Sequence, residues 1–320
     1  MGPGGSSSLV SKGSHRPIML GVVGDSAVGK TTLTEGIVNI FGKERVTAIC
    51  TDDYHRYDRQ ERKVLNITPL NPECNYMNIM EQHLQLFRMG EPILKPHYNH
   101  NFGTFDPPEL VEPADYVVVE GLLPFYTKGM CDSFDIKVYL DPPEDVRRAW
   151  KIKRDCTKRN YTPDEVIADL EKREPDSQAY IRPQREFADI IVRFYPPAET
   201  HDADPTRYNV KLVLRPTLPH PYLAEIAAET RTSRYEPIRL ILARDRGKPV
   251  DVLEIDGGVP TEVAADAEQI IWDRMSHPEG KLNREAIGLF ITGDQVRRGE
   301  ALALTQLLIV FQLAGARAIR

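Results

Sequence analysis

The sequence predicts an α/β fold in which a mostly parallel sheet is flanked by helices and followed by a C-terminal α+β extension. Short strand patterns alternate with helical patterns over the first two hundred residues, and most are nearly continuous apolar runs. Such runs are typical of strands buried on both faces of a parallel sheet. Strands are expected at 18–23, 46–50, 116–120, 136–140 and 190–195.

Helical patterns occupy the intervals between these strands, at 31–41, 79–89, 142–158 and 163–172. The last two carry N-terminal signals: a capping residue, a proline at the first helical position and a glutamate three residues after the cap. These residues are Asp141, Pro142 and Glu144 in one helix, and Thr162, Pro163 and Glu165 in the other.

The chain is expected to divide into three parts. Residues 1–16 are rich in Gly and Ser and predict a disordered leader, 17–200 form the α/β domain, and 201–320 form the extension. In the extension, strands are expected at 210–214, 238–243, 250–255 and 287–291, and helices at 261–275 and 300–314. The second and third of these strands form a hairpin joined through residues 245–248. The extension shows no catalytic pattern, so we expect a structural or oligomeric role for it.

The composition excludes several classes of function. A formal net charge of −6 leaves no basic excess with which a whole-chain nucleic-acid binder would neutralise phosphates. The four cysteines lie far apart without metal-ligand spacing, as is typical of reduced thiols in a cytoplasmic protein. The most apolar segment, 302–314, is interrupted by polar residues and is too short to span a bilayer. We therefore expect no nucleic acid and no membrane as partners.

A glycine-rich loop stands between the first expected strand and the first expected helix. Gly24 and Gly29 would let backbone N–H groups wrap a polyphosphate at the positive end of the helix. Lys30 would add a charge at the β- and γ-phosphates, and the Thr31 hydroxyl would ligate Mg²⁺. The segment predicts a P-loop that binds a nucleoside triphosphate. The expected nucleotide-binding residues are Gly24, Asp25, Ser26, Ala27, Val28, Gly29, Lys30, Thr31 and Thr32.

Two further expected strands end in carboxylates. Asp52 and Asp53 follow the strand at 46–50, and Glu120 ends the strand at 116–120. The carboxyl edge of an open α/β sheet is where ligands bind, and a carboxylate there can accept a proton from an attacking hydroxyl. Glu120 would hold Mg²⁺ or its water shell. No Asn-Lys-x-Asp segment for reading guanine occurs, which disfavours a GTPase.

Several ordered motifs lie between residues 17 and 197, and their joint match is more specific than any one of them. They include Asp52-Asp53-Tyr54-His55 with Asp58-Arg59, Lys95-Pro96-His97-Tyr98-Asn99-His100, Val118-Val119-Glu120-Gly121-Leu122, Ala149-Trp150-Lys151-Ile152-Lys153-Arg154-Asp155 and Ala179-Tyr180-Ile181. Together they resemble the phosphoribulokinases of plants and cyanobacteria and, more distantly, the uridine kinases. The resemblance implies a P-loop kinase core, ATP and Mg²⁺ as cofactors, and phosphorylation of ribulose 5-phosphate at its C1 hydroxyl. It also implies a homodimer in the cytoplasm and a place in carbon fixation (the Calvin cycle).

The resemblance assigns roles by position. Asp52 matches the catalytic base, and Lys30, Arg154 and Arg159 complete the expected catalytic set, the two arginines within a lid segment. Thr31, Glu120 and Asp53 are the expected metal residues. The expected substrate residues are His55, Arg59, Arg62, Lys63, Tyr98 and His100. Because arginine contacts phosphate in a bidentate way, Arg59 is the first choice for the substrate's own phosphate.

Alternatives stay open at this point. A solvated amphipathic helix also explains the lid cations, and a charged surface explains the residues around Arg59. The protein could be a related kinase acting on uridine or another sugar phosphate, or a non-catalytic nucleotide-dependent sensor. The plant branch closes a regulatory disulfide between a P-loop cysteine and the position of Cys50. Here the loop has Ala27 and Val28 and no cysteine follows Cys156, so we expect no such switch.

Overall fold

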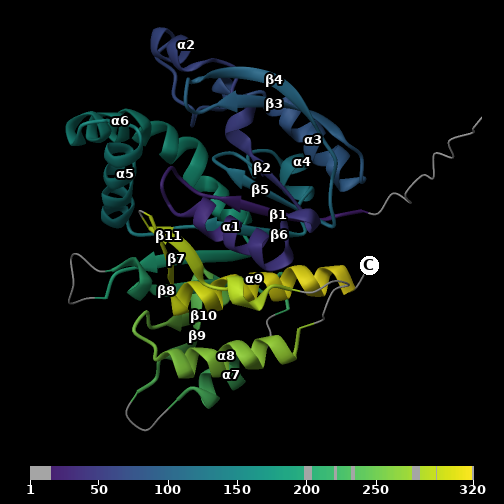
Figure 1. Ribbon diagram of the computed structural model, residues 1–320, viewed down its shortest axis with the longest axis vertical. Coiled ribbons are helices and arrows are strands. Elements are labelled where there is room, and N and C mark those ends of the chain that lie inside the picture. Colours follow the sequence, from purple (N-terminus) through teal and green to yellow (C-terminus); the bar gives the residue numbers. More distant parts are fainter. Residues whose placement is uncertain are drawn as a thin grey trace, which may run out of the picture.

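A computed structural model describes the chain, and one eight-stranded sheet runs through it (Figure 1). The strand order is β2-β5-β1-β6-β7-β8-β10-β9. Residues 1–15 of the predicted leader lie outside the described part. The residues that the structure describes are 16–197, 204–219, 222–231, 235–275, 282–292 and 294–318.

The first five strands of this order are mutually parallel, which confirms the predicted sheet. Their bounds are β1 Ile18–Val23, β2 Val46–Cys50, β5 Tyr116–Gly121, β6 Ile136–Leu140 and β7 Ile190–Tyr195. Apolar cores cover both faces of the sheet. One is formed with α1 (Lys30–Phe41), α8 (Thr261–Asp273) and α9 (Glu300–Ala318), and the other with α3 (Met77–Arg88) and α4 (Lys128–Asp132). Burial on both faces is why these strands are continuously apolar rather than alternating.

The remaining three strands continue the same sheet in antiparallel fashion. They are β8 Asn209–Leu214, β10 Lys248–Ile255 and β9 Ile238–Asp245. The expected hairpin between β9 and β10 is present, and its turn uses Arg246 and Gly247 at φ of 48° and 82°. The expected division near residue 200 therefore crosses a continuous sheet, and two separate domains remain a prediction.

The helices are α1 Lys30–Phe41, α2 Arg59–Val64, α3 Met77–Arg88, α4 Lys128–Asp132, α5 Glu144–Lys158, α6 Pro163–Asp176, α7 Leu223–Glu229, α8 Thr261–Asp273 and α9 Glu300–Ala318. The last of these is longer than the predicted 300–314, and by length and composition it could cross a membrane. However, 72% of its apolar window is buried, and it packs on α1, α8, β1 and β8 (Figure 1). That burial is typical of a core helix.

The two predicted helix starts have different outcomes. Thr162 caps α6 and forms a capping box with Glu165, as expected. The start predicted at Asp141 is wrong, since α5 begins at Glu144 without a side-chain cap. The residue before a proline is disfavoured in the helical region, so Pro142 cannot begin a helix ahead of Pro143. The Asp141 carboxylate instead accepts a hydrogen bond from Arg185 at 3.1 Å.

Two hairpins lie outside the main sheet. One joins β3 Ile93–Asn99 to β4 Thr104–Val111, and the other joins β11 Leu289–Thr292 to β12 Gln295–Arg298. The first was not predicted from the sequence, and β11 overlaps the strand expected at 287–291. In Figure 1 the β3–β4 hairpin lies beside α2 at the top of the view, above the sheet. This hairpin carries the second half of the candidate site.

Candidate active site

The P-loop connects β1 to α1, with residues 24–29 in the loop and Lys30, Thr31 and Thr32 in the first helical turn. A Cβ on Gly24 would lie 2.8 Å from the Leu140 carbonyl oxygen, so only glycine permits this close approach. Gly29 lies at the N-terminus of α1 with φ 93°, a region that favours glycine. Ala27 also has a positive φ, of 67°, while Val28 is buried in the core. The loop thus has the backbone that its sequence predicts.

Lys30 is held by the loop itself. Its Nζ donates to the carbonyl oxygens of Gly24 at 2.9 Å and Asp25 at 2.8 Å. Burial lowers the pKa of Lys30, while the carboxylates of Glu120 and Asp52 act in the opposite direction. The ammonium group is therefore positioned beside both acidic residues that the sequence singled out.

Thr31 and Glu120 meet across the sheet edge. The Thr31 hydroxyl donates to Glu120 Oε1 at 3.1 Å. Burial raises the pKa of Glu120, and the nearby Lys30 opposes that rise. Together the two side chains offer only oxygen donors, the type that Mg²⁺ prefers, so these residues fit the ion that the sequence implies.

Asp52 lies in a short 3-10 turn, Thr51–Tyr54, that follows β2. This turn approaches β5 closely, because a Cβ on Gly121 would lie only 1.6 Å from Thr51 Oγ1. The Asp52 side chain is 31% exposed, and its Oδ2 is 3.9 Å from His100 Nε2. Burial alone would raise the pKa of Asp52, but the charges of His55, His100 and Lys30 lower it below its ordinary value. The carboxylate is thus ionised and reachable by a substrate.

Asp53 is engaged by β3 rather than left free for a metal. Its carboxylate pairs with Lys95 through one oxygen and accepts the Tyr98 backbone N–H at 2.9 Å through the other. Both oxygens therefore fasten β3 to the turn after β2. A metal role for Asp53 remains a prediction that these contacts do not support.

Tyr98 is the centre of the predicted substrate side. Its hydroxyl accepts a hydrogen bond from Arg62 at 2.6 Å, and its ring meets the rings of His55 and His100 at 5.0 and 5.1 Å. Arg62 is buried, and its guanidinium also lies over the Tyr98 ring. A hydrogen bond of 2.7 Å between His55 Nδ1 and Asn75 Oδ1 orients the His55 ring, and burial lowers the pKa of His55. Residues far apart in sequence thus converge on one aromatic ring.

Arg59 and Lys63 occupy different environments on α2. Arg59 donates to the His100 carbonyl oxygen at 2.7 Å and reaches the tip of the β3–β4 hairpin. Asp58 and Glu61 form a capping box that fixes the start of this short helix. Lys63 is solvent-exposed. Of the three predicted substrate cations on α2, Arg59 and the buried Arg62 contact the β3–β4 hairpin, whereas Lys63 faces solvent.

The predicted lid cations gather around Asp155 on α5. Asp155 Oδ2 lies 2.9 Å from Lys151 Nζ. Asp155 Oδ1 lies 2.8 Å from Arg154 Nε and 3.5 Å from Arg159 Nη1. Burial opposes ionisation, but the bonds from Arg154 and Lys151 lower the pKa of Asp155 to about 2. Arg154 also approaches the P-loop, at 3.4 Å from Ser26 Oγ. Asp155 thus holds several cations of one helix near the loop.

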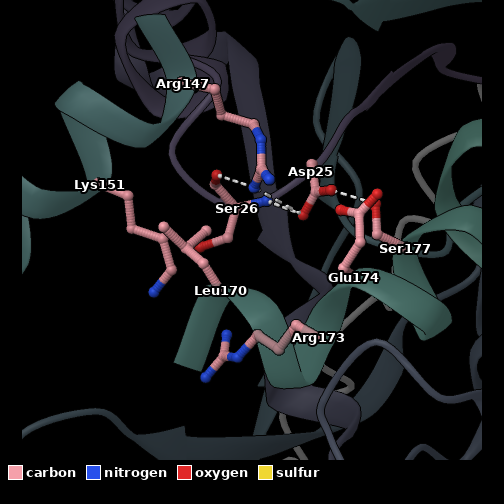
Figure 2. Close-up of a pocket in the computed structure, with 8 residues that line it drawn as sticks. All are labelled: Asp25, Ser26, Arg147, Lys151, Leu170, Arg173, Glu174 and Ser177. Atoms are coloured by element: carbon pink, nitrogen blue, oxygen red, sulfur yellow. Dashed lines mark hydrogen bonds and ion pairs between the residues drawn. The ribbon is translucent and has the colours of Figure 1, made fainter. Parts of the chain in front are cut away.

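Figure 2 shows a second link, through Asp25, between the P-loop and the lid helices, a name used here for α5, which carries the predicted lid cations, and the following helix α6. Its Oδ1 accepts the Ser26 backbone N–H at 2.7 Å and lies 3.4 Å from Arg147 on α5. Its Oδ2 accepts a hydrogen bond from the hydroxyl of Ser177, which directly follows α6. One loop carboxylate therefore contacts α5 and the residue that follows α6.

Sequence reasoning missed three residues of this region as site residues: Arg147, Arg173 and Ser177. Arg147 is one of seven lysine and arginine residues between positions 147 and 159, so a signal for it existed in the sequence. The charge of Arg173 acts on Asp52 and on Arg159, although Arg173 lies in the next helix and pairs with Asp169 at 2.8 Å. Nothing in the local sequence distinguishes Ser177 from a surface serine.

Comparison with known proteins identifies related sequences and folds. The family model described as "Phosphoribulokinase / Uridine kinase family" matches residues 19–201. A phosphoribulokinase of Synechocystis is 36% identical over 255 residues, covering 76% of this chain and 77% of that protein. A chloroplastic phosphoribulokinase of Spinacia oleracea is 34% identical over 62% of this chain, which spans about half of the spinach protein (54%). The solved phosphoribulokinase from Rhodobacter spheroides shares the fold, with a TM-score of 0.58, 16% identity, and coverage of 82% of this chain and 97% of that one.

Proposed function

The chain belongs to the phosphoribulokinase / uridine kinase family, and we propose that it transfers the γ-phosphoryl group of ATP to the C1 hydroxyl of ribulose 5-phosphate. The products are ribulose 1,5-bisphosphate and ADP. One observation carries the proposal. An ionised, partly exposed carboxylate, Asp52, lies between the P-loop lysine Lys30 and the cationic and aromatic cluster around Tyr98.

The chemistry assigned to this site is general-base catalysis with electrostatic stabilisation. Asp52 accepts the proton of the attacking hydroxyl as the new O–P bond forms and the bond to the leaving ADP oxygen breaks. Lys30 and the backbone N–H groups at the start of α1 stabilise the charge on the phosphoryl oxygens. Thr31 and Glu120 would hold Mg²⁺, which neutralises charge on the polyphosphate when bound.

The substrate's own phosphate needs a cation away from the P-loop. Arg59 lies on the hairpin side of the site and is tied to the backbone of His100, so its guanidinium is already oriented. Arg62 uses two of its nitrogens for Tyr57 and Tyr98, so we assign it a positioning role rather than contact with the phosphate. Lys63 is exposed, so we assign it a place at the outer rim of the substrate site, farther from the reacting hydroxyl than Arg59. His55 and His100 flank Tyr98 and are assigned to the sugar hydroxyls.

Arg154 and Arg159 complete the assignment as lid residues. Both are held by Asp155, and Arg154 already approaches the P-loop at Ser26. Closing α5 over the nucleotide would exclude water and bring two further cations to the transferring group. The observed contacts of Arg154 favour this role over a purely solvated helix face.

We also propose a cytoplasmic homodimer. The edge strand β9 presents the exposed side chains Ile241 and Leu242, and an unpaired strand edge is a template for pairing with a second chain. Light scattering on the purified protein, with a Leu242→Lys variant as comparison, tests the dimer. A monomer at micromolar concentration would contradict it.

ATP consumption with a panel of acceptors tests the activity. Ribulose 5-phosphate, uridine and pantothenate are supplied separately with MgATP, and ADP release is followed together with the mass of the product. We expect turnover with ribulose 5-phosphate only. Preferred phosphorylation of uridine would support a related kinase, and nucleotide binding without turnover on any acceptor would support the sensor alternative.

A further inference from the structure

The thiol of Cys50 takes no part in the proposed reaction, yet it lies at the catalytic base. Cys50 is the last residue of β2 and is partly exposed. Its Sγ, a carboxylate oxygen of Asp52 and a ring nitrogen of His100 all lie within 4.8 Å of one another. Among the described residues, this is the one cluster of three or more His, Cys, Asp and Glu side chains with such spacing.

The donor set of this cluster differs from that of the Thr31–Glu120 pair. Thiolate sulfur and imidazole nitrogen suit Zn²⁺ and related softer cations, whereas Mg²⁺ prefers oxygen. Three protein ligands with a fourth position open to water is the arrangement of accessible zinc sites. The donor chemistry of the two clusters therefore favours different metals.

The geometry requires only a small adjustment. Tetrahedral zinc with bonds of about 2.0–2.3 Å places its ligand atoms about 3.5 Å apart. His100 already lies 3.9 Å from Asp52. His100 is also about half exposed and sits at the turn between β3 and β4, so its ring has room to move toward the metal, at the expense of its contact with the Tyr98 ring. The thiol proton leaves as the metal binds.

We propose that Cys50, Asp52 and His100 form an inhibitory site for a soft divalent cation, with Zn²⁺ as the ion of choice. Binding engages the Asp52 carboxylate, which then cannot accept the proton of the attacking hydroxyl. Binding also occupies the His100 ring nitrogen, which then cannot contact the sugar. The inhibitory consequence rests on the proposed function, whereas the metal binding does not.

Metal binding is measured first, on purified full-length protein without nucleotide or Mg²⁺. Zn²⁺ is titrated in competition with a chromophoric chelator, and Cd²⁺ is used as a second probe because a cadmium–thiolate bond absorbs in the ultraviolet. We expect Cys50→Ser and His100→Asn each to weaken Zn²⁺ binding by at least about 100-fold, since loss of a mere outer-shell partner costs about 10- to 100-fold. The thiolate band should vanish in Cys50→Ser.

Cys156→Ser is the matched control, because Cys156 is also partly exposed but lies outside the cluster. It should bind Zn²⁺ and Cd²⁺ as the unaltered protein does. Equal Zn²⁺ affinity in the unaltered protein and in both cluster variants would overturn the site. His100→Asn alters an exposed turn residue, so it tests the site even if Cys50→Ser fails to fold.

Inhibition is then measured as the ratio of activity with and without Zn²⁺ at saturating MgATP. This ratio should be about 0.1 or lower for the unaltered protein and for Cys156→Ser, which is at least a tenfold loss of activity. It should stay near one for Cys50→Ser. Higher ribulose 5-phosphate should restore activity, because metal and substrate compete for Asp52 and His100. Binding that depends on Cys50 without any inhibition would overturn the inhibitory role. Absence of kinase activity would overturn the proposed function and leave the binding result intact.

Discussion

The nucleotide end and the acceptor end of the site are built in different ways. At the nucleotide end, Lys30 is held by carbonyl oxygens five and six positions earlier in the same loop. At the acceptor end, Tyr98 contacts Arg62 and Asp53 across 36 and 45 positions. The first end is built mainly from its own backbone, with added side-chain contacts to α5 and Ser177, and the second is assembled from side chains on separate elements. A substitution at the acceptor end should therefore disturb the other side chains of that end. The conformation of the P-loop at the nucleotide end should change little in response.

Asp52→Asn should have the largest effect, because Asp52 lies where the two ends meet. The amide has nearly the volume of the carboxylate but cannot accept the substrate proton, so kcat should fall by about 10²–10⁴-fold. ATP affinity, set by the P-loop, should change less than about threefold. Steady-state kinetics with direct ATP binding by calorimetry measures both. Preserved kcat with weakened ATP binding would contradict the base assignment.

Arg59→Ala should affect the acceptor end alone. Loss of a charge-assisted contact costs about 1.5–3 kcal/mol, so KM for ribulose 5-phosphate should rise about tenfold to a hundredfold while KM for ATP stays nearly constant. Arg56→Ala is the matched control, because Arg56 is exposed and its guanidinium lies over Tyr76 instead. Equal rises in both KM values for Arg59→Ala would mean that the substrate phosphate binds elsewhere.

The same contrast explains what the sequence could predict. The P-loop and the parallel strands follow from local patterns, and their bounds agree with the structure to within a residue or two. The β3–β4 hairpin was missed, because Pro96 interrupts the pattern and the register shifts between Lys95 and His97. Asp53 was expected at the metal because it adjoins Asp52, but its partners Lys95 and Tyr98 come from that hairpin. Because this hairpin was not predicted, the sequence could not show that its residues Lys95 and Tyr98 would occupy the Asp53 carboxylate.

The lid connects the two ends, and its central carboxylate has a pH signature. The pKa of Asp155 is about 2 in the folded protein against an ordinary value of 3.8. A lowered pKa stabilises the fold above the ordinary value, and that stability is lost as the pH falls from about 4 to 2. The difference in free energy of unfolding between the unaltered protein and Asp155→Asn should include about 2 kcal/mol that disappears over this range.

Denaturant unfolding at a series of pH values measures this difference. Asp132→Asn is the control, because Asp132 forms a solvent-exposed pair with Lys128, and such pairs contribute little to the free energy of unfolding. A difference for Asp155→Asn that is independent of pH between 5 and 2 would show that Asp155 acts through packing and not through its charge.

Ser177→Ala should have the smallest effect of these substitutions. It tests whether the conformation of the P-loop depends on residues outside the loop. The substitution removes one hydrogen bond to Asp25 and leaves the contacts of Asp25 with Arg147 and the Ser26 backbone in place. A hydrogen bond to a charged group is worth about 1.5–3 kcal/mol, but the two remaining contacts keep the loop largely in place. We therefore expect KM for ATP to rise by less than about threefold, with KM for ribulose 5-phosphate unchanged.

Ser133→Ala controls for the loss of a buried hydroxyl, because Ser133 donates to the Gly129 carbonyl oxygen away from the P-loop. It should leave both KM values unchanged. If Ser177→Ala behaves in the same way, the P-loop holds its conformation without the lid, and the nucleotide end is as local as its sequence motif suggests. If KM for ATP rises in Ser177→Ala alone, Asp25 transmits the position of the lid helices to the loop, and the nucleotide end depends on distant residues as the acceptor end does.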